Sequence, residues 1–177
     1  MSDNDSIIIM RVNSDIADGI FNETINCLFE SVPLNNQLLN KKVYIYSSGM
    51  EEAIVGYVKI SQIYNDKPYK ILINTGHFKD EYSYEVIKKF GKYNRNCHAF
   101  GLSDVTEFDL HLPLTFINDI NKDFRITHFI EHIDCNDSIY YLIKEWDKEF
   151  SLDGKLCDNP KEMSSLILRR NKDRVIL

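Results

Sequence analysis

Two hydrophobic segments joined by a short Ser/Gly connection, at residues 42–63, constrain the fold of this chain more than any other feature. The first, Val43-Tyr44-Ile45-Tyr46, is β-branched and aromatic, and it ends at Ser47-Ser48-Gly49, which supplies turn residues. The second, residues 53–63, alternates with the period of two that a strand requires. Gly56 interrupts its apolar face, which indicates either a bulge or the close approach of a backbone or ligand. The pattern predicts two strands connected by a turn.

The length of 177 residues and the 44% hydrophobic content suffice to bury a core, and no Ser-, Gly- or Pro-rich linker divides the chain. We expect one main domain with an appended segment. The apolar run from Ile7 to Met10 is too short for a signal peptide, and no run approaches the roughly 20 apolar residues of a membrane helix. The cysteines are scattered without a CxxC pair, which favours free thiols: Cys27, Cys97, Cys135 and Cys157. A cytoplasmic protein without membrane contact is expected.

The charge of the chain is uneven. The net charge of −6 disfavours general attraction to phosphates, but residues 86–98 hold four cations and no acid, so the remainder carries −10. The cations alternate with aromatic residues in this basic segment: Lys88, Lys89, Phe90, Lys92, Tyr93 and Arg95. Cations of this kind bind phosphates, and rings stack on unpaired bases. A helix ending near Gly91 would also gain stability from cations at its C-terminus, and both interpretations stay open.

The remaining pattern predicts an α+β protein. Strands are expected at 7–11, 27–29, 42–47, 53–63, 97–108 and 125–133. Helices are expected after the cap candidates Asn13 or Ser14, from Pro68, and at 81–91. Two amphipathic helices follow in the C-terminal part, the first behind Asn136 or Asp137 and the second around Met163 to Ile167. We expect both to pack on the preceding body.

The sequence motifs give little support for an enzymatic site. His128-Phe129-Ile130-Glu131-His132 matches the HxxEH metalloprotease signature, but its apolar residues alternate as in a strand. Cys97 and His98 are neighbours in a predicted strand, so they point to opposite faces. No GxxxxGK[ST], GxGxxG or GxSxG motif is present. The prediction is therefore no catalytic residue, no metal site and no cofactor.

The order of these elements resembles the ASCH family of the PUA-like superfamily. The resemblance rests on Ile45-Tyr46-Ser47-Ser48, on Val55-Gly56-Tyr57-Val58-Lys59-Ile60, and on the order of the elements over residues 6–134. It implies a β-barrel with rim helices at 1–134 and leaves 135–177 as a C-terminal helical extension. It also implies binding of RNA or of a modified nucleobase in a cleft near the first helix. Some relatives hydrolyse amide-modified nucleosides or cleave RNA.

This chain departs from the family at a charged GxKxxExR-type motif. The alignment places Glu23 at the glycine, Ile25 at the lysine, Leu28 at the glutamate and Glu30 at the arginine. Isoleucine and leucine neither bind phosphate nor transfer protons. The departure favours a non-enzymatic protein.

We therefore expect a binding domain for RNA or a modified nucleobase, with a regulatory role. The predicted nucleic-acid contacts are Lys88, Lys89, Lys92, Tyr93 and Arg95, and the predicted cleft residues are Tyr44, Tyr46, Ser47, Ser48, Gly56 and Tyr57. One alternative is a protein-interaction module that uses the acidic N-terminal face, of the type found in phages or mobile elements. A second alternative is a nucleoside amidohydrolase rebuilt around Lys59 with Glu23 or Glu30.

Overall fold

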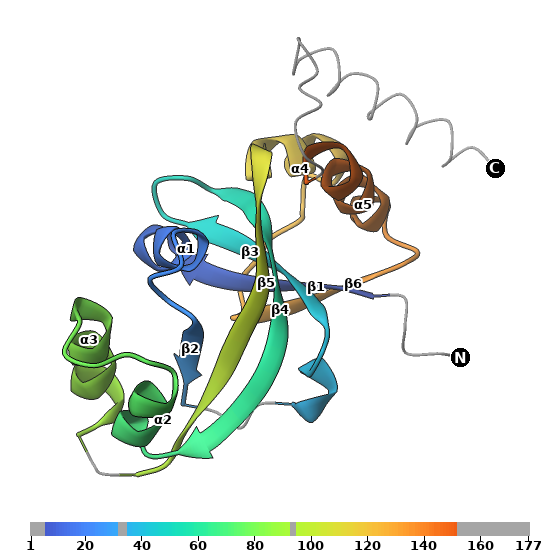
Figure 1. Ribbon diagram of the computed structural model, residues 1–177. Coiled ribbons are helices and arrows are strands. Elements are labelled where there is room, and N and C mark those ends of the chain that lie inside the picture. Colours follow the sequence, from blue (N-terminus) through green and yellow to red (C-terminus); the bar gives the residue numbers. More distant parts are fainter. Residues whose placement is uncertain (1–5, 32–34, 93–94, 152–177) are drawn as a thin grey trace. The chain divides into compact units, whose positions relative to one another are not determined.

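The computed structural model describes residues 6–31, 35–92 and 95–151 (Figure 1). Tyr93, Cys157 and the predicted second C-terminal helix lie outside the described residues. The helices are α1 (Ser14–Phe21), α2 (Pro68–Asn74), α3 (Glu81–Phe90), α4 (Leu114–Ile120) and α5 (Ser138–Phe150), with a short 3₁₀ helix at Asn36–Leu38. Of the helices in these ranges, none is long and apolar enough to cross a membrane.

Six strands form one mixed sheet in the order β2-β5-β4-β3-β1-β6. Their bounds are β1 (Ser6–Asn13), β2 (Cys27–Glu30), β3 (Lys42–Ser48), β4 (Ala53–Asp66), β5 (Cys97–Pro113) and β6 (Ile130–Asp134). β1 runs parallel to β3, with Ile9 opposite Tyr44, and antiparallel to β6. β2 runs antiparallel to β5. The structure thus confirms the predicted α+β class, whereas closure of the strands into a barrel stays a prediction.

The chain divides into two compact units, each assembled from separate stretches of sequence. Unit 1 comprises Met1–Ala17, Val43–Tyr57 and Thr106–Leu177, and unit 2 comprises Asp18–Lys42 and Val58–Val105. β4 and β5 contribute residues to both units. Each unit has a hydrophobic core of its own.

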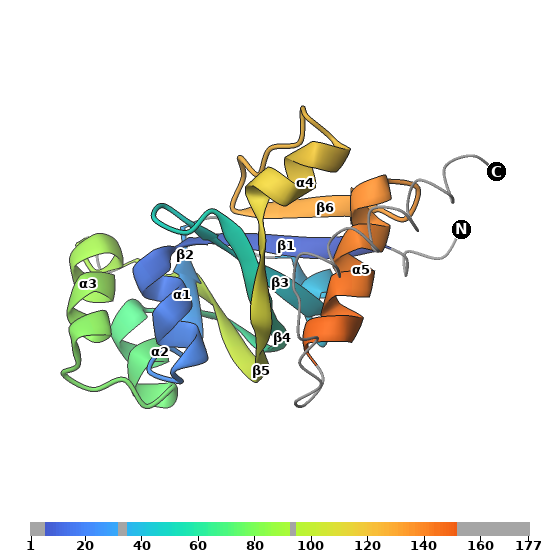
Figure 2. The ribbon, with the colours of Figure 1, turned by 90° about the horizontal axis from the view of Figure 1, so that it is seen from above.

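The core of unit 1 is completed by α5. This helix begins after Asp137, whose side chain accepts a hydrogen bond from the N–H of Ile139 (2.9 Å), as the sequence predicts. Figure 2 shows α5 beside β6 and α4, and its buried face joins residues of β1, β3 and β5 in one cluster. Trp146 is 1% exposed and donates a hydrogen bond to the carbonyl of Leu110 (2.7 Å). Asp147 accepts a hydrogen bond from the Tyr44 hydroxyl (2.6 Å). The first C-terminal helix is thereby part of this core.

The core of unit 2 lies between two helices and two strands. α2 and α3 place Ile71, Leu72 and Val86 against Phe29 of β2, in a cluster that also includes Ala99 of β5. The rings of Phe29 and Phe90 lie 5.9 Å apart between centroids. Burial of these apolar side chains holds α2 and α3 against the strands of this unit.

Two segments differ from the sequence prediction. β6 begins at Ile130, five residues after the predicted start, because the Glu131 carboxylate accepts hydrogen bonds from the backbone N–H groups of Thr127 and His128 (3.1 and 3.0 Å). Those groups are satisfied by a side chain instead of a neighbouring strand. α4 was not predicted, and it follows a β5 strand that extends to Pro113.

The contact between Tyr44 and Asp147 gives a first testable prediction. Tyr44→Phe removes a hydrogen bond to a carboxylate that is 8% exposed, and we expect a loss of about 1–3 kcal/mol in the free energy of unfolding. Urea denaturation measures this loss. Tyr141→Phe is the matched control, because Tyr141 is an exposed residue of α5, the helix that carries Asp147. It should change stability by less than about 0.5 kcal/mol. Equal effects of both substitutions would contradict a stabilising role for the Tyr44 hydroxyl.

Candidate functional site

The basic segment lies at the C-terminal end of α3. The helix begins after Asp80, whose carboxylate accepts a hydrogen bond from the N–H of Ser83 (2.6 Å), and its last turn carries Lys88 and Lys89. Both lysines are exposed, as are Lys92 and Arg95 in the segment that follows. Four of the five predicted nucleic-acid contacts are therefore surface residues in one short segment, and the fifth, Tyr93, is outside the described part of the chain.

Lys88 forms an exposed ion pair within α3. Lys88 Nζ lies 3.7 Å from a Glu85 carboxylate oxygen, and the two side chains are 78% and 67% exposed. Exposed pairs of this kind contribute little stability, so a phosphate would compete for Lys88 at small cost. Lys89 Nζ lies 5.0 Å from the centroid of the Phe90 ring. The geometry leaves the positive charge of the helix end on the surface.

Three exposed aromatic side chains in unit 2 were missed by sequence reasoning. Tyr69 on α2, Phe78 in the connection between α2 and α3, and Tyr84 on α3 are 47%, 70% and 63% exposed. Aromatic residues at helical spacing are usually core residues, and we made no prediction for these rings. The signal was present for Tyr84, because it lies two residues from Val86 and four from Lys88, which places it on the outward side of α3.

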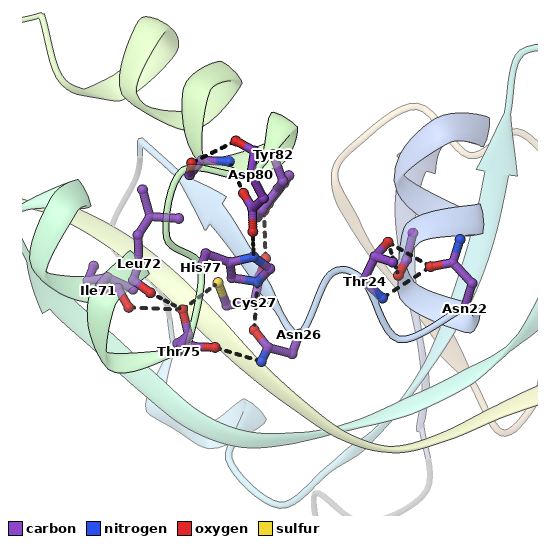
Figure 3. A network of polar contacts seen from close by, with 12 residues as sticks. Asn22, Thr24, Asn26, Cys27, Ile71, Leu72, Thr75, His77, Asp80 and Tyr82 are labelled. Atoms are coloured by element: carbon purple, nitrogen blue, oxygen red, sulfur yellow. Dashed lines mark hydrogen bonds and ion pairs between the residues drawn. The ribbon is translucent and has the colours of Figure 1, made fainter.

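A buried histidine fixes the connection between α2 and α3 (Figure 3). His77 is 6% exposed, with Nδ1 at 2.7 Å from Asp80 Oδ2 and Nε2 at 2.9 Å from Asn26 Oδ1. The amide of Asn26 is oriented by its own donation to the carbonyl of Thr75 (2.8 Å), so its oxygen faces the ring. Both ring nitrogens thus lie within hydrogen-bonding distance of an oxygen atom, so the ring is held from both sides.

Other groups of unit 2 complete this network. Burial alone would raise the pKa of Asp80, but hydrogen bonds from His77 and Ser83 outweigh it and lower the pKa. Tyr82 donates from its hydroxyl to the carbonyl of Cys27 (2.6 Å), and its ring meets that of His77 edge to face. The network ties the connection that carries Phe78 to the start of β2.

The described thiols of unit 2 are not arranged as nucleophiles. Burial raises the pKa of Cys27 to about 11, and burial also raises that of Cys97 to about 11. A thiol with such a pKa is almost entirely protonated at neutral pH. Cys97 Sγ donates to the carbonyl of Asp66 (3.6 Å), while His98 is only partly buried. These contacts agree with structural roles for the Cys97-His98 pair.

The predicted cleft residues lie in or beside the core of unit 1. Tyr44, Tyr46 and Ser47 are 1%, 3% and 2% exposed, and Gly56 is buried within β4. Burial, reinforced by the hydrogen bond to Asp147, raises the pKa of Tyr44, so its hydroxyl stays protonated and donates. Tyr44 and Tyr46 belong to the core cluster of unit 1, and the role of these residues in ligand binding stays a prediction.

The two half-buried members of the predicted cleft make similar contacts. Ser48 donates to the carbonyl of Val12 (2.9 Å), and the Tyr57 ring lies 6.3 Å from that of Phe108. Both are thus engaged within unit 1.

A pocket of about 380 Å³ in unit 1 is lined by other residues: Glu51, Glu52, Ala53, Asp109, Leu110, His111 and Pro113. His111 lies between two carboxylates, with Nδ1 2.5 Å from Glu51 and Nε2 3.3 Å from Glu107. The surplus of acidic groups does not suit a phosphate.

The HxxEH residues do not form a helical metal site. Glu131 and His132 belong to β6, and His128 precedes the strand with its Nδ1 2.9 Å from Glu131. Burial would raise the pKa of Glu131, but hydrogen bonds from His128 and Thr127 lower it. Across residues 6–31, 35–92 and 95–151, no three His, Cys, Asp or Glu side chains are grouped as metal ligands.

The aligned lysine and glutamate positions of the charged motif are apolar and buried in unit 2. Ile25 and Leu28 are 7% and 5% exposed. A Cβ atom at Gly19 would lie 2.5 Å from Ile25 Cδ1, so the glycine of α1 leaves the space that Ile25 fills. Glu23, at the position of the motif's glycine, has φ = 62°, a left-handed conformation that glycine adopts without steric cost. The turn after α1 thus keeps a glycine-type backbone without the glycine.

The hydrolase alternative rested on Lys59 with Glu23 or Glu30. Lys59 Nζ lies 3.7 Å from Asp104 Oδ2, and Glu30 accepts hydrogen bonds from the N–H and hydroxyl of the adjacent Ser31 (2.9 and 3.3 Å). These local pairings offer no support for a catalytic set.

The chain has an ASCH-like α+β fold, as the resemblance implied. A crystal structure of ASCH from Zymomonas mobilis superimposes with a TM-score of 0.62 at 16% identity, covering 77% of this chain and 93% of that one. A serine-to-alanine mutant of that protein gives 0.62 at 16% identity, with 78% and 94% covered. A tyrosine-to-phenylalanine mutant gives 0.58 at 16% identity, with 71% and 88% covered. No protein-family model and no curated protein matches the sequence. The likeness at this identity is one of fold.

The conformation of Glu23 gives a second prediction. Glu23→Gly relieves a left-handed conformation in a non-glycine residue, and we expect the free energy of unfolding to rise by about 0.5–1 kcal/mol. Asp18→Gly, at an exposed position inside α1, is the control and should lower stability by about 1 kcal/mol. Thermal and urea denaturation measure both. Destabilisation by both substitutions alike would rule out the interpretation of Glu23 as a glycine-type position.

The pair of His77 and Asp80 gives a third prediction. Asp80→Asn keeps a side chain that caps α3 but removes the charge opposite His77, and we expect a loss of about 1 kcal/mol at neutral pH. The folded pKa of Asp80 lies below its unfolded value, so the ionised carboxylate stabilises the protein above about pH 4. This contribution is lost as the pH falls through the folded pKa.

The stability difference between wild type and Asp80→Asn should therefore shrink in acid. Urea denaturation at neutral and acidic pH measures it. Glu81→Gln, which removes an exposed charge from the first turn of the same helix, is the matched control and should cost less at neutral pH. A pH-independent difference for Asp80→Asn would show that the charge of Asp80 contributes nothing.

Proposed function

We propose that this chain is a non-enzymatic, ASCH-like binding domain that holds RNA phosphates at the C-terminal end of α3. The observation that carries the proposal is the exposed basic segment of unit 2. Residues 67–95 hold seven cationic and three acidic side chains, a net charge of +4, in a chain of net charge −6. A local excess of this kind supplies the electrostatic attraction on which nucleic-acid binding depends.

Stabilisation of the helix end does not explain the whole cluster. Lys88 and Lys89 lie in the last turn of α3, where a cation interacts favourably with the helix dipole. Lys92 and Arg95 lie beyond Gly91, and the dipole effect falls off within the last turn. The exposed cations after the helix therefore support a ligand with repeated negative charges.

Phosphate binding at this surface is favoured over a base held in the predicted cleft. Tyr44 and Tyr46 are buried, and the Tyr44 hydroxyl is engaged by Asp147. A modified nucleobase would have to displace protein contacts there, whereas RNA at α3 displaces water and weak ion pairs. We also propose that the strands close into a PUA-like barrel and that the protein has a regulatory role.

We propose binding without catalysis because this sequence lacks the charged residues of the GxKxxExR-type motif. Ile25 and Leu28 occupy the lysine and glutamate positions and are part of the buried interior of unit 2. Neither side chain binds a phosphate or moves a proton. Binding without turnover is what the remaining residues support.

A binding titration with charge variants tests the proposal. We expect the full chain to bind fluorescein-labelled single-stranded RNA, with affinity that falls as salt rises. Replacing Lys88, Lys89, Lys92 and Arg95 together by glutamine should weaken binding by at least about tenfold and lower the salt slope by about 3, since each single-strand phosphate contact contributes about 0.7. Fluorescence anisotropy at several salt concentrations measures both quantities.

A matched variant separates local contacts from net charge. Replacing four exposed lysines outside the basic segment by glutamine changes the net charge equally: Lys42, Lys122, Lys144 and Lys148. This variant should keep most of the affinity and the salt slope. Equal loss in both variants, or no salt-sensitive binding by the wild type, would refute the proposal and favour the protein-interaction alternative.

A further inference from the structure

The helices next to the basic segment expose rings beside cations. Lys79 Nζ lies 5.2 Å from the centroid of Phe78, whose side chain is 70% exposed. Tyr84 and Lys88 are four residues apart on α3, so they are neighbours on one helix face. Tyr69 on α2 is followed directly by the exposed Lys70. Phe78 and Tyr84 thus each have a lysine close to them.

The rings are on the outward sides of their helices. On α3 the buried residues are Ser83 and Val86, while Tyr84 and Ile87 are 63% and 40% exposed. On α2 the buried residues are Pro68, Ile71 and Leu72, while Tyr69 and Ile73 are 47% and 59% exposed. The two helices contact each other and lie side by side in Figures 1 and 2. They therefore present apolar and aromatic surface that the core of unit 2 does not use.

The connection between the helices holds Phe78 in place before any ligand arrives. Its neighbour His77 is buried and bonded to Asp80 and Asn26, and Gly76 and Lys79 adopt the left-handed backbone (φ = 85° and 59°). A connection fixed in this way loses little backbone conformational entropy when a flat group stacks on the Phe78 ring. The geometry is that of a preformed platform.

The chemistry of this surface selects its ligand. The net charge of +4 over residues 67–95 calls for an anionic partner, and exposed rings offer flat faces to unpaired bases. Single strands present free base faces together with a phosphate on every nucleotide, whereas a duplex keeps its base faces stacked inside. Alternating cations and rings fit the single strand better than the duplex.

We infer that Tyr69, Phe78 and Tyr84, with the lysines beside them, form a stacking platform for unpaired bases, and that the RNA of the proposed function is bound as a single strand. This inference rests on the proposed function and names the ligand class of that same surface. The stacked bases supply affinity without sequence preference, because every base has a π-face.

Fluorescence anisotropy of the full chain with fluorescein-labelled oligo(U) and with an RNA duplex of equal phosphate number tests the inference. We expect oligo(U) to bind at least about tenfold more tightly than the duplex. Phe78→Leu and Tyr84→Leu should each weaken oligo(U) binding by about tenfold and leave the salt slope unchanged, because they remove stacking faces and no cations. Tyr84→Phe keeps the ring and should bind as the wild type does.

Tyr141→Leu is the matched control, because Tyr141 is 41% exposed on α5, outside this surface. It should leave the affinity unchanged. Circular dichroism melts of the leucine variants show whether each is folded, which is expected for exposed positions. A variant that does not fold is replaced by Phe78→Ser or Tyr84→Ser in the same assay.

The outcomes separate the two proposals. Salt-sensitive binding that is equal for duplex and oligo(U), or unchanged in the leucine variants, would overturn the stacking platform and leave the phosphate contacts standing. Displacement of oligo(U) by polyglutamate of equal charge as efficiently as by unlabelled oligo(U) would also overturn it, since charge alone would then be recognised. Loss of all salt-sensitive binding would instead refute the proposed function.

Discussion

The buried contact of His77 with Asp80 and Asn26 is the constraint on which the candidate surface depends. A histidine that is 6% exposed and faces acceptors at both nitrogens would be costly without those partners. Asp80 also caps α3, so one carboxylate fixes both the connection and the start of the helix. The orientation of Phe78, Lys79 and the following lysines therefore follows from a small polar network in the interior of unit 2.

Two positions that align with the charged family motif are used for hydrophobic packing in this chain. Ile25 fills the space beside Gly19, and Leu28 is buried in β2, so the aligned lysine and glutamate positions contribute apolar burial here. Glu23 has a left-handed backbone, which glycine adopts without steric cost. The left-handed turn and the apolar packing beside it are therefore compatible with the ASCH-like fold without a charged motif.

Local pattern predicted most of the elements. β-Branched and aromatic residues identified β3, and alternation identified β4. The 3.6-residue spacing behind Asn136 or Asp137 identified α5. The late start of β6 came from the Glu131 side chain, which takes the N–H groups that a strand pairing would use. Hydrophobic periodicity does not show that a side chain will accept hydrogen bonds from these backbone groups. The helix α4 was missed for another reason, because its seven residues give too short a pattern.

The candidate site was less accessible to prediction, because exposure depends on contacts between distant residues. Tyr44 and Asp147 are 103 residues apart, and their hydrogen bond is one reason that Tyr44 is a core residue and not an exposed cleft residue. The basic segment was identified from charge alone, whereas Phe78 and Tyr84 required knowledge of which faces of the helices are buried.

The opposite environments of the aromatic residues in the two units decide where a ligand has room. In unit 1 the rings of Tyr44, Tyr57 and Phe108 pack on one another beneath α5, and their contacts are already made. In unit 2 Phe78 and Tyr84 have most of their surface in water. A base that stacks on an exposed ring gains contact at the expense of water alone, while one that enters the packed cluster must first replace protein contacts. Binding energy is therefore available at α2 and α3, beside the cations that a phosphate backbone requires.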